Sequence, residues 1–362
     1  MWARWLSHDG PRSPWLGVLL LLVVLGLATA PFTLEGIRAL SVAAKILVFV
    51  VLVASFDLLL GYTGIVSFAH TMFFGIGAYG VAIALDRLGP SWSALGLGVG
   101  VALVLSALLS LAIGLFSLRV RAIFFAMITL AVASAFQTLA SQLSHFTGGE
   151  DGLTYKLPAA LMPSTEYWDD EIFGVMLDGR LLTYYLLFVV SVLAFLALLR
   201  LVNSPFGRVL QAVRENEFRA EALGYRVVVF RTLSSVWASM FATIAGVLYA
   251  IWLRYNGPDT TLSFEVMMDV LLMVVIGGMG SMYGAVLGAC LFLVAQSYLQ
   301  DALGAVGHAL SDVPVLAALF SADRWLLWLG VLFVLSVHYF PNGVVGRLRE
   351  WAWQARHQQG QP

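Results

Sequence analysis

Charged residues are scarce in this chain of 362 residues, since only 11% are Asp, Glu, Lys or Arg. Soluble globular domains carry about 25% charged residues, so a wholly soluble protein is excluded. The single cysteine, Cys290, lies in an apolar run, so neither a disulfide framework nor a cysteine-rich metal site can form. A formal net charge of −1 gives no reason to expect nucleic acid as a partner.

Sequence motifs for nucleotide or peptide hydrolysis are also missing. No Gly-x-x-x-x-Gly-Lys-Ser/Thr loop, His-Glu-x-x-His pattern or Gly-x-Ser-x-Gly elbow occurs in the sequence. The apolar runs also lack the crowded carboxylates and histidines of a proton relay. We therefore expect no ATPase site, no catalytic residue, and neither cofactor nor metal bound by this chain.

Long apolar runs recur from end to end, and 60% of the residues are hydrophobic. A helix needs about 20 apolar residues to cross a bilayer. The runs therefore predict an all-α, polytopic membrane protein that forms one transmembrane domain over residues 1–362. The ten expected spans are Trp15–Phe32, Ile37–Leu60, Thr63–Leu85, Ser91–Leu118, Ala122–Leu143, Leu181–Leu201, Thr232–Trp252, Phe264–Met282, Tyr283–Gln300 and Trp325–Phe340.

Basic residues are shared unevenly between the loops, and loops rich in Lys and Arg tend to stay in the cytoplasm. With the N-terminus inside, thirteen fall on the cytoplasmic side: Arg4, Arg12, Arg119, Arg121, Arg200, Arg208, Arg214, Arg219, Arg226, Arg231, Arg347, Arg349 and Arg356. Six fall outside: Arg38, Arg87, Lys156, Arg180, Arg254 and Arg324. The distribution predicts cytoplasmic N- and C-termini, a periplasmic loop at residues 144–180 and a cytoplasmic loop at residues 202–231.

The loop at residues 202–231 concentrates charge in a chain that has little of it. Ser204 can cap a helix that starts at Pro205, because proline lacks the N–H group that a first turn leaves unpaired. Asn216 can cap a second, shorter helix, and Gly224 stands where a left-handed residue would end it. Two short, capped helices between apolar spans predict a docking element for a partner in the water.

Two glycine-rich segments, Gly61–Gly80 and Gly277–Ala289, interrupt the apolar spans. Irregular backbone within a membrane is tolerated only where it is buried in protein or lines a cavity, and broken helices point to a transport site. Close helix packing is the alternative, and we favour it for Gly284 and Gly288, which form a GxxxG pattern. The residues predicted to line a translocation path are Gly61, Tyr62, Gly64, Ser67, His70, Gly75, Gly77, Gly277, Gly278 and Gly280.

Polar side chains inside the expected spans either face such a path or are interfacial or paired structural groups. Asp57 is close enough to the cytoplasmic end of its span to reach the interface. His70 needs a partner for its ring N–H, which is either a carbonyl freed by the break at Gly61–Gly64 or a wet cavity. The polar residues expected inside spans are Lys45, Asp57, His70, Gln137, Glu265 and Asp269.

Taken together, several blocks of this sequence resemble the LivM-type permeases of ABC importers for branched-chain amino acids. The blocks are Asp57–Tyr79, Thr147–Leu153, Ser204–Tyr225, Val274–Ala289 and the closing Phe340–Gly346. The blocks are spread over most of the length of the chain, and as a set in this order and spacing they are highly specific. The chain departs from the family pattern at Asp269, at Ala285 and around His70, so a urea or short-amide permease, the sister group, remains the alternative.

This resemblance implies a permease subunit in the bacterial inner membrane that pairs with a homologous, LivH-like permease and contacts membrane lipid. It also implies a periplasmic substrate-binding protein and two cytoplasmic ATP-binding subunits, which carry ATP and Mg²⁺. The segment Glu221–Gly224 corresponds to the family's segment that docks in a groove of the ATPase. The implied coupling residues are Arg214, Glu215, Asn216, Glu221, Ala222 and Gly224.

Two other classes of protein stay open as alternatives. An ion-coupled secondary carrier is disfavoured by the charged loop and by the missing carboxylate relay. A non-transporting membrane anchor is disfavoured by the broken helices, from which a scaffold would gain nothing.

Overall fold

The structure is a computed structural model that describes residues 14–33, 36–117, 122–172, 175–309, 320–340 and 343–348. Within these ranges, ten helical segments are long and apolar enough to cross a membrane, which confirms the all-α, polytopic prediction. Parts of the predicted 144–180 loop and of the closing Phe340–Gly346 block lie outside the described residues. So do six of the basic residues used to predict orientation: Arg4, Arg12, Arg119, Arg121, Arg349 and Arg356.

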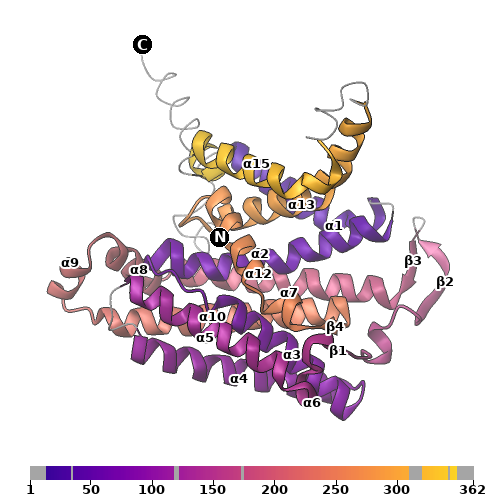
Figure 1. The fold of residues 1–362 in the computed structure, drawn as a ribbon, viewed down its shortest axis with the longest axis horizontal. Coiled ribbons are helices and arrows are strands. Elements are labelled where there is room, and N and C mark those ends of the chain that lie inside the picture. The colour runs from indigo at the N-terminus through magenta and orange to yellow at the C-terminus, as the bar shows by residue number, and fades with distance from the viewer. Residues whose placement is uncertain are drawn as a thin grey trace, which may run out of the picture.

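The membrane helices run alongside one another in Figure 1. They are α1 (Pro14–Thr33), α2 (Ile37–Thr63), α3 (His70–Leu88), α4 (Trp92–Ser117), α5 (Ala122–Gln142), α7 (Gly179–Val202), α10 (Val227–Leu253), α12 (Phe264–Gly277), α13 (Met282–Ala309) and α15 (Trp325–Tyr339). The short helices are α6 (Ser144–Thr147), α8 (Pro205–Glu215), α9 (Glu217–Ala222) and α11 (Pro258–Thr261). Single 3-10 turns lie at Gly149–Asp151, Ala159–Leu161 and Ala322–Arg324.

The third predicted span starts later than the sequence suggested. Helix α2 continues through Gly61 and ends at Gly64, which has a left-handed backbone with φ of 71°. Helix α3 then begins at His70 and not at Thr63, so residues 64–69 form the connection between the two helices. The eighth span is also interrupted as expected, because Gly278 and Gly280 take positive φ values of 114° and 80° between α12 and α13.

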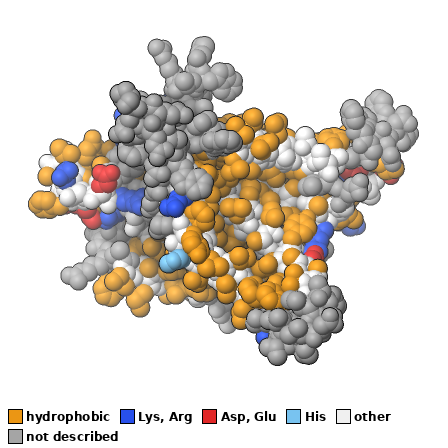
Figure 2. Space-filling view, turned by 90° about the horizontal axis from the view of Figure 1, so that it is seen from above, with side chains coloured by type: hydrophobic (Ala, Val, Ile, Leu, Met, Phe, Trp, Pro, Cys, Tyr) orange, Lys and Arg blue, Asp and Glu red, His pale blue; other side chains and the backbone are white. Residues whose placement is uncertain are grey.

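The core lies where α2, α3 and α10 meet, and these helices are buried along most of their length. Glycine permits this close approach: a Cβ on Gly77 would overlap the backbone of Thr243, and one on Gly246 would overlap that of Phe74. The outer helices α1, α4, α5 and α15 expose many apolar side chains. Figure 2 shows that hydrophobic side chains cover the middle of one face, with charged ones gathered towards its ends, as expected for a lipid-facing belt.

The two polar loops lie at opposite ends of the molecule (Figure 1). One end carries the antiparallel hairpin of β2 (Glu166–Ile172) and β3 (Val175–Asp178), together with β1 (Leu153–Thr154), which pairs with β4 (Tyr255–Asn256). The other end carries α8 and α9, and α7 alone connects β3 to α8. The loops therefore emerge on opposite sides of the apolar belt, and which side is cytoplasmic stays a prediction.

Candidate functional site

The α8–α9 element (residues 204–224) has the caps that the sequence predicted. Ser204 Oγ accepts a hydrogen bond from the backbone N of Gly207 at 3.4 Å. Asn216 Oδ1 accepts one from the backbone N of Arg219 at 2.9 Å, which starts α9. Gly224 follows α9 with a φ of 91°, the left-handed conformation expected at a helix end. Local sequence alone therefore fixes the shape of this element.

The tip of this element projects a mixture of apolar and charged side chains into solvent. Phe218 is 82% exposed and Leu223 is 71% exposed, although both lie among charged residues. An ion pair between Arg231 and Glu217 at 2.8 Å ties α9 to α10. Exposed large apolar groups on a rigid, polar tip are typical of a contact surface for another protein. The predicted coupling residues Arg214, Glu215, Asn216, Glu221, Ala222 and Gly224 are all exposed.

The same element is hydrogen-bonded to the first helix break, and α2 connects that break to the second. The guanidinium of Arg214, on α8, donates a hydrogen bond to the carbonyl oxygen of Gly61 near the end of α2. Asp57, one turn before Gly61, accepts a hydrogen bond from the backbone N of Gly280 at 2.9 Å. Asp57 is only 1% exposed, so the expectation that it reaches the interface is wrong. We call Asp57, Gly61, Gly64, Arg214, Gly278 and Gly280 the glycine junction.

Glycine is required at this junction because backbones and a guanidinium meet there without room for side chains. A Cβ on Gly61 would overlap the Asp57 carboxylate and the backbone N of Gly280. One on Gly280 would lie 2.8 Å from an Arg214 nitrogen, and one on Gly64 would lie 3.3 Å from Arg214 Cγ. Gly278 meets a further glycine, Gly343. The structure thus brings together two glycine segments that the sequence could identify only separately.

His70 has a partner that the sequence did not suggest. Its ring Nε2 lies 2.8 Å from Ser55 Oγ on α2. Ser55 donates its own proton to the carbonyl of Leu52 at 2.7 Å, so the imidazole N–H is the donor towards Ser55. The ring is 1% exposed and packs against Phe56 with centroids 5.3 Å apart. The partner is therefore a hydroxyl group of the neighbouring helix, rather than a freed carbonyl.

The other residues predicted for the path lie in tightly packed surroundings. A Cβ on Gly75 would overlap the side chain of Leu262. Gly277 faces Gly284 across the turn between α12 and α13, which confirms the close packing expected for Gly284. Tyr62 and Ser67 are buried as well.

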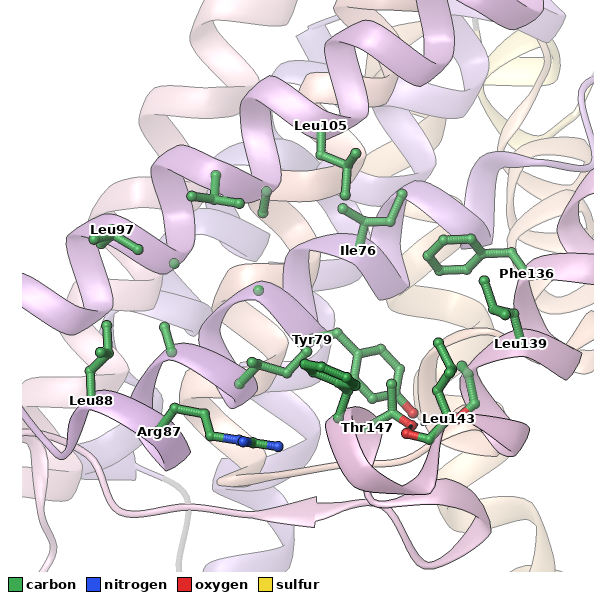
Figure 3. A pocket seen from close by; sticks show the side chains of 18 residues that line it. Ile76, Tyr79, Arg87, Leu88, Leu97, Leu105, Phe136, Leu139, Leu143 and Thr147 are labelled. Atoms are coloured by element: carbon green, nitrogen blue, oxygen red, sulfur yellow. Dashed lines mark hydrogen bonds between the residues drawn. The ribbon is translucent and has the colours of Figure 1, made fainter.

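A cavity of about 460 Å³ opens between α3, α4 and α5, and none of the ten predicted path residues lines it. Figure 3 shows Ile76, Leu105 and Phe136 above Tyr79 and Arg87. Tyr79 is 5% exposed, and its hydroxyl has no hydrogen-bond partner among the described residues. This cavity could not be predicted from the sequence, because its mostly apolar lining residues resemble the lipid-facing surface of any membrane helix.

A second polar cluster joins α2, α12 and α13. Lys45 Nζ lies 3.3 Å from Gln296 Oε1, and Gln296 Nε2 donates to Asp269 Oδ2 at 3.1 Å. The sequence identified Lys45 and Asp269 as polar residues within spans but missed Gln296. A lone amide in the middle of a long apolar helix gives little signal in the sequence, and only the fold shows that Gln296 connects the two charges.

Ten candidate membrane helices, two interior helix breaks and a protruding element hydrogen-bonded to one of them are typical of a membrane transport permease. Sequence comparison agrees, since residues 38–337 match the family described as branched-chain amino acid transport system / permease component. The chain belongs to this family, and the resemblance seen in its sequence blocks is confirmed.

Its similar proteins include bacterial and archaeal permeases. It is 28% identical over 349 residues to the high-affinity branched-chain amino acid transport system permease protein LivM of Salmonella typhimurium, covering 91% of this chain and 75% of that protein. The protein of the same description from Escherichia coli is 27% identical over 346 residues, with the same coverage. A probable branched-chain amino acid transport permease protein LivM of Methanocaldococcus jannaschii is 26% identical over 323 residues, covering 80% and 88%.

Proposed function

We propose that this chain is the transmembrane permease subunit of an ATP-driven importer that carries branched-chain or related hydrophobic amino acids across the bacterial inner membrane. The observation that carries the proposal is the hydrogen bond from the α8–α9 element to the first helix break, which Asp57 connects to the second, in a chain of this permease family. The names of its relatives, which are branched-chain amino acid permeases, support the substrate class.

In this proposal the chain works with four other subunits. A homologous second permease completes the pathway, and a periplasmic substrate-binding protein delivers the amino acid. Two cytoplasmic ATP-binding subunits hold ATP and Mg²⁺ and dock on the exposed tip around Phe218 and Leu223. This chain then carries no ATPase site of its own and converts movement of the docked subunits into movement of its helices.

The glycine junction is the part that transmits this movement. When the ATP-binding subunits close, α9 is displaced together with α8, and Arg214 carries the displacement to Gly61 at the end of α2. The hydrogen bond from Gly280 to Asp57 carries it on to the turn between α12 and α13. Alternating access is then a change between two packings of these helices, biased by ATP.

The test is to reconstitute the permease pair, the ATP-binding subunits and the binding protein in proteoliposomes. We expect uptake of labelled leucine, isoleucine and valine that requires ATP and the binding protein. Labelled urea serves as the control substrate and should not be taken up. Uptake of leucine driven by an ion gradient without ATP would refute the importer assignment, and uptake of urea alone would refute the substrate class.

A further inference from the structure

The polar cluster of Lys45, Gln296 and Asp269, which we call the membrane cluster, lies in the half of the membrane nearest the β2–β3 hairpin. Helix α2 starts at that end, because its other end binds Arg214 of α8. Lys45 lies eight residues into α2, or about 12 Å from its start at 1.5 Å per residue. Asp269 lies five residues into α12, about 8 Å from its start. The membrane cluster therefore lies about two helical turns below the membrane surface at the hairpin end of the molecule.

The two charges of the cluster do not form a direct ion pair in the described part of the chain. The amide of Gln296 stands between them, and it contacts Lys45 through its oxygen and Asp269 through its nitrogen. All three side chains are half-buried. An ammonium group has three donors and a carboxylate about four acceptor sites, so one hydrogen bond to Gln296 leaves each charge with unused capacity.

Charges held apart in this way are a poor means of joining helices. An ionisable group inside a membrane is costly, and a direct ion pair or an apolar contact would connect α2, α12 and α13 at lower cost. A separated positive and negative group instead complement a ligand that carries both charges. The α-carboxylate and α-ammonium groups of a free amino acid are such a ligand.

The cluster is also continuous with charges at the surface. Arg38 and Asp301 form an ion pair at 2.6 Å, and both side chains are more than half exposed. Arg38 precedes Lys45 by seven residues, which places both on the same face of α2. Asp301 follows Gln296 by five residues on α13. Polar groups thus extend from the exposed start of α2, and from the turn of α13 beside it, towards the membrane cluster, so a zwitterion can exchange one set of partners for the next.

We propose that the membrane cluster is a binding site for the charged backbone groups of a zwitterionic amino acid, with Lys45 on the carboxylate and Asp269 on the ammonium group. The proposal rests on the proposed function, and it adds to it a substrate site within this chain. Gln296 keeps the two charges apart when the site is empty. The site replaces the water that a zwitterion loses when it enters the membrane.

The decisive variant is a double substitution, Lys45→Met and Asp269→Leu, which removes both charges together. No unpaired charge is left in the membrane, so the complex should assemble in wild-type amounts with an unchanged melting temperature or a higher one. ATP hydrolysis stimulated by the loaded binding protein should persist. Uptake of labelled leucine per assembled complex should fall by about tenfold or more, the loss expected for one charged hydrogen bond. Gln137→Leu, a change at a polar position on α5, is the matched control and should transport normally.

Wild-type uptake by the doubly substituted complex would overturn the proposal and make the cluster a structural connection. If that complex does not assemble, the single variant Lys45→Gln tests the site instead. It removes the positive charge, and its amide can still form a hydrogen bond to Gln296. A raised KM for leucine in Lys45→Gln supports the site, and an unchanged KM and maximal rate overturn it. Failure of the wild-type complex to transport leucine with ATP is a separate result, which counts against the proposed function and not against this site.

Discussion

Single residues in this permease are constrained by contacts that lie far away in the sequence. Gly61 is the clearest case, because it is a helical residue that touches both the Asp57 carboxylate and the backbone of Gly280. Other helical glycines, such as Gly96 in α4, have open space around them. Glycine is therefore needed for close packing at Gly61 but not at Gly96, and alanine substitutions should distinguish the two positions.

Gly61→Ala should lower the stability of the folded protein by about 1–3 kcal/mol, the usual cost of forcing a group into a filled site. Gly96→Ala is its matched control and should be neutral or stabilising by up to about 1 kcal/mol, because alanine favours a helix over glycine. Thermal unfolding in detergent, followed by fluorescence, measures both. Equal melting temperatures for the two variants would contradict the contacts drawn at Gly61.

His70 should act through its hydrogen bond to Ser55. His70→Leu removes the ring N–H and should lower stability by about 0.5–1.5 kcal/mol, the net value of one hydrogen bond. His70→Gln keeps a donor of similar reach and should restore most of the loss. Transport per assembled complex should be unchanged in both, as measured by leucine uptake normalised to purified complex. A fall in uptake with altered affinity in both variants would instead place His70 on the translocation path.

At the level of elements, the α8–α9 element is shaped locally but acts through distant contacts. Its caps lie within three residues of the groups they satisfy, which is why the sequence was enough to predict it. Its connection to the first helix break depends on Arg214, whose partner Gly61 belongs to α2. Local contacts therefore set the shape of the element, whereas its attachment to the membrane helices depends on the tertiary fold.

Changes at the C-terminal end of α9 should separate ATP hydrolysis from transport. Gly224 has a φ of 91°, which proline cannot adopt, so Gly224→Pro should displace the tip while the membrane helices stay inserted. Glu221→Lys reverses a charge on the exposed surface and should also uncouple hydrolysis from leucine uptake. Gly224→Asn is the matched control, because asparagine tolerates a left-handed backbone, and it should remain coupled.

ATPase rate and leucine uptake, measured on the same proteoliposomes, test this prediction. Normal ratios of uptake to hydrolysis in both Gly224→Pro and Glu221→Lys would rule out a docking role for the tip.

On the scale of the whole molecule, the apolar belt and its two polar ends were predictable and the interior was not. Composition and run length are enough to count spans, because a bilayer imposes a fixed length on each helix. The burial of Asp57 was missed because its partner, Gly280, lies 223 positions further along the chain. Gln296 and the cavity beside Tyr79 were missed because a lone amide and an apolar lining carry little signal until packing brings their neighbours together.

The orientation of the molecule can be tested with single cysteines in a Cys290→Ala background. Thr165 lies in the loop with the hairpin, and Asn203 lies at the opposite end, just after α7. An impermeant thiol reagent added to intact cells with a permeable outer membrane should label a cysteine at position 165 and leave one at position 203 unlabelled until the cells are opened. Labelling of position 203 alone would reverse the predicted topology.

The polar side chains of α2 have consequences for how the protein is made. Arg38, Lys45 and Asp57 find their partners at Asp301, Gln296 and Gly280, which are 263, 251 and 223 positions away. A ribosome therefore delivers α2 to the insertion machinery long before any of these partners is translated. Until synthesis nears its end, Lys45 and Asp57 lie in the membrane without Gln296 and Gly280, so nascent chains stalled before α12 should be preferred substrates for membrane proteases.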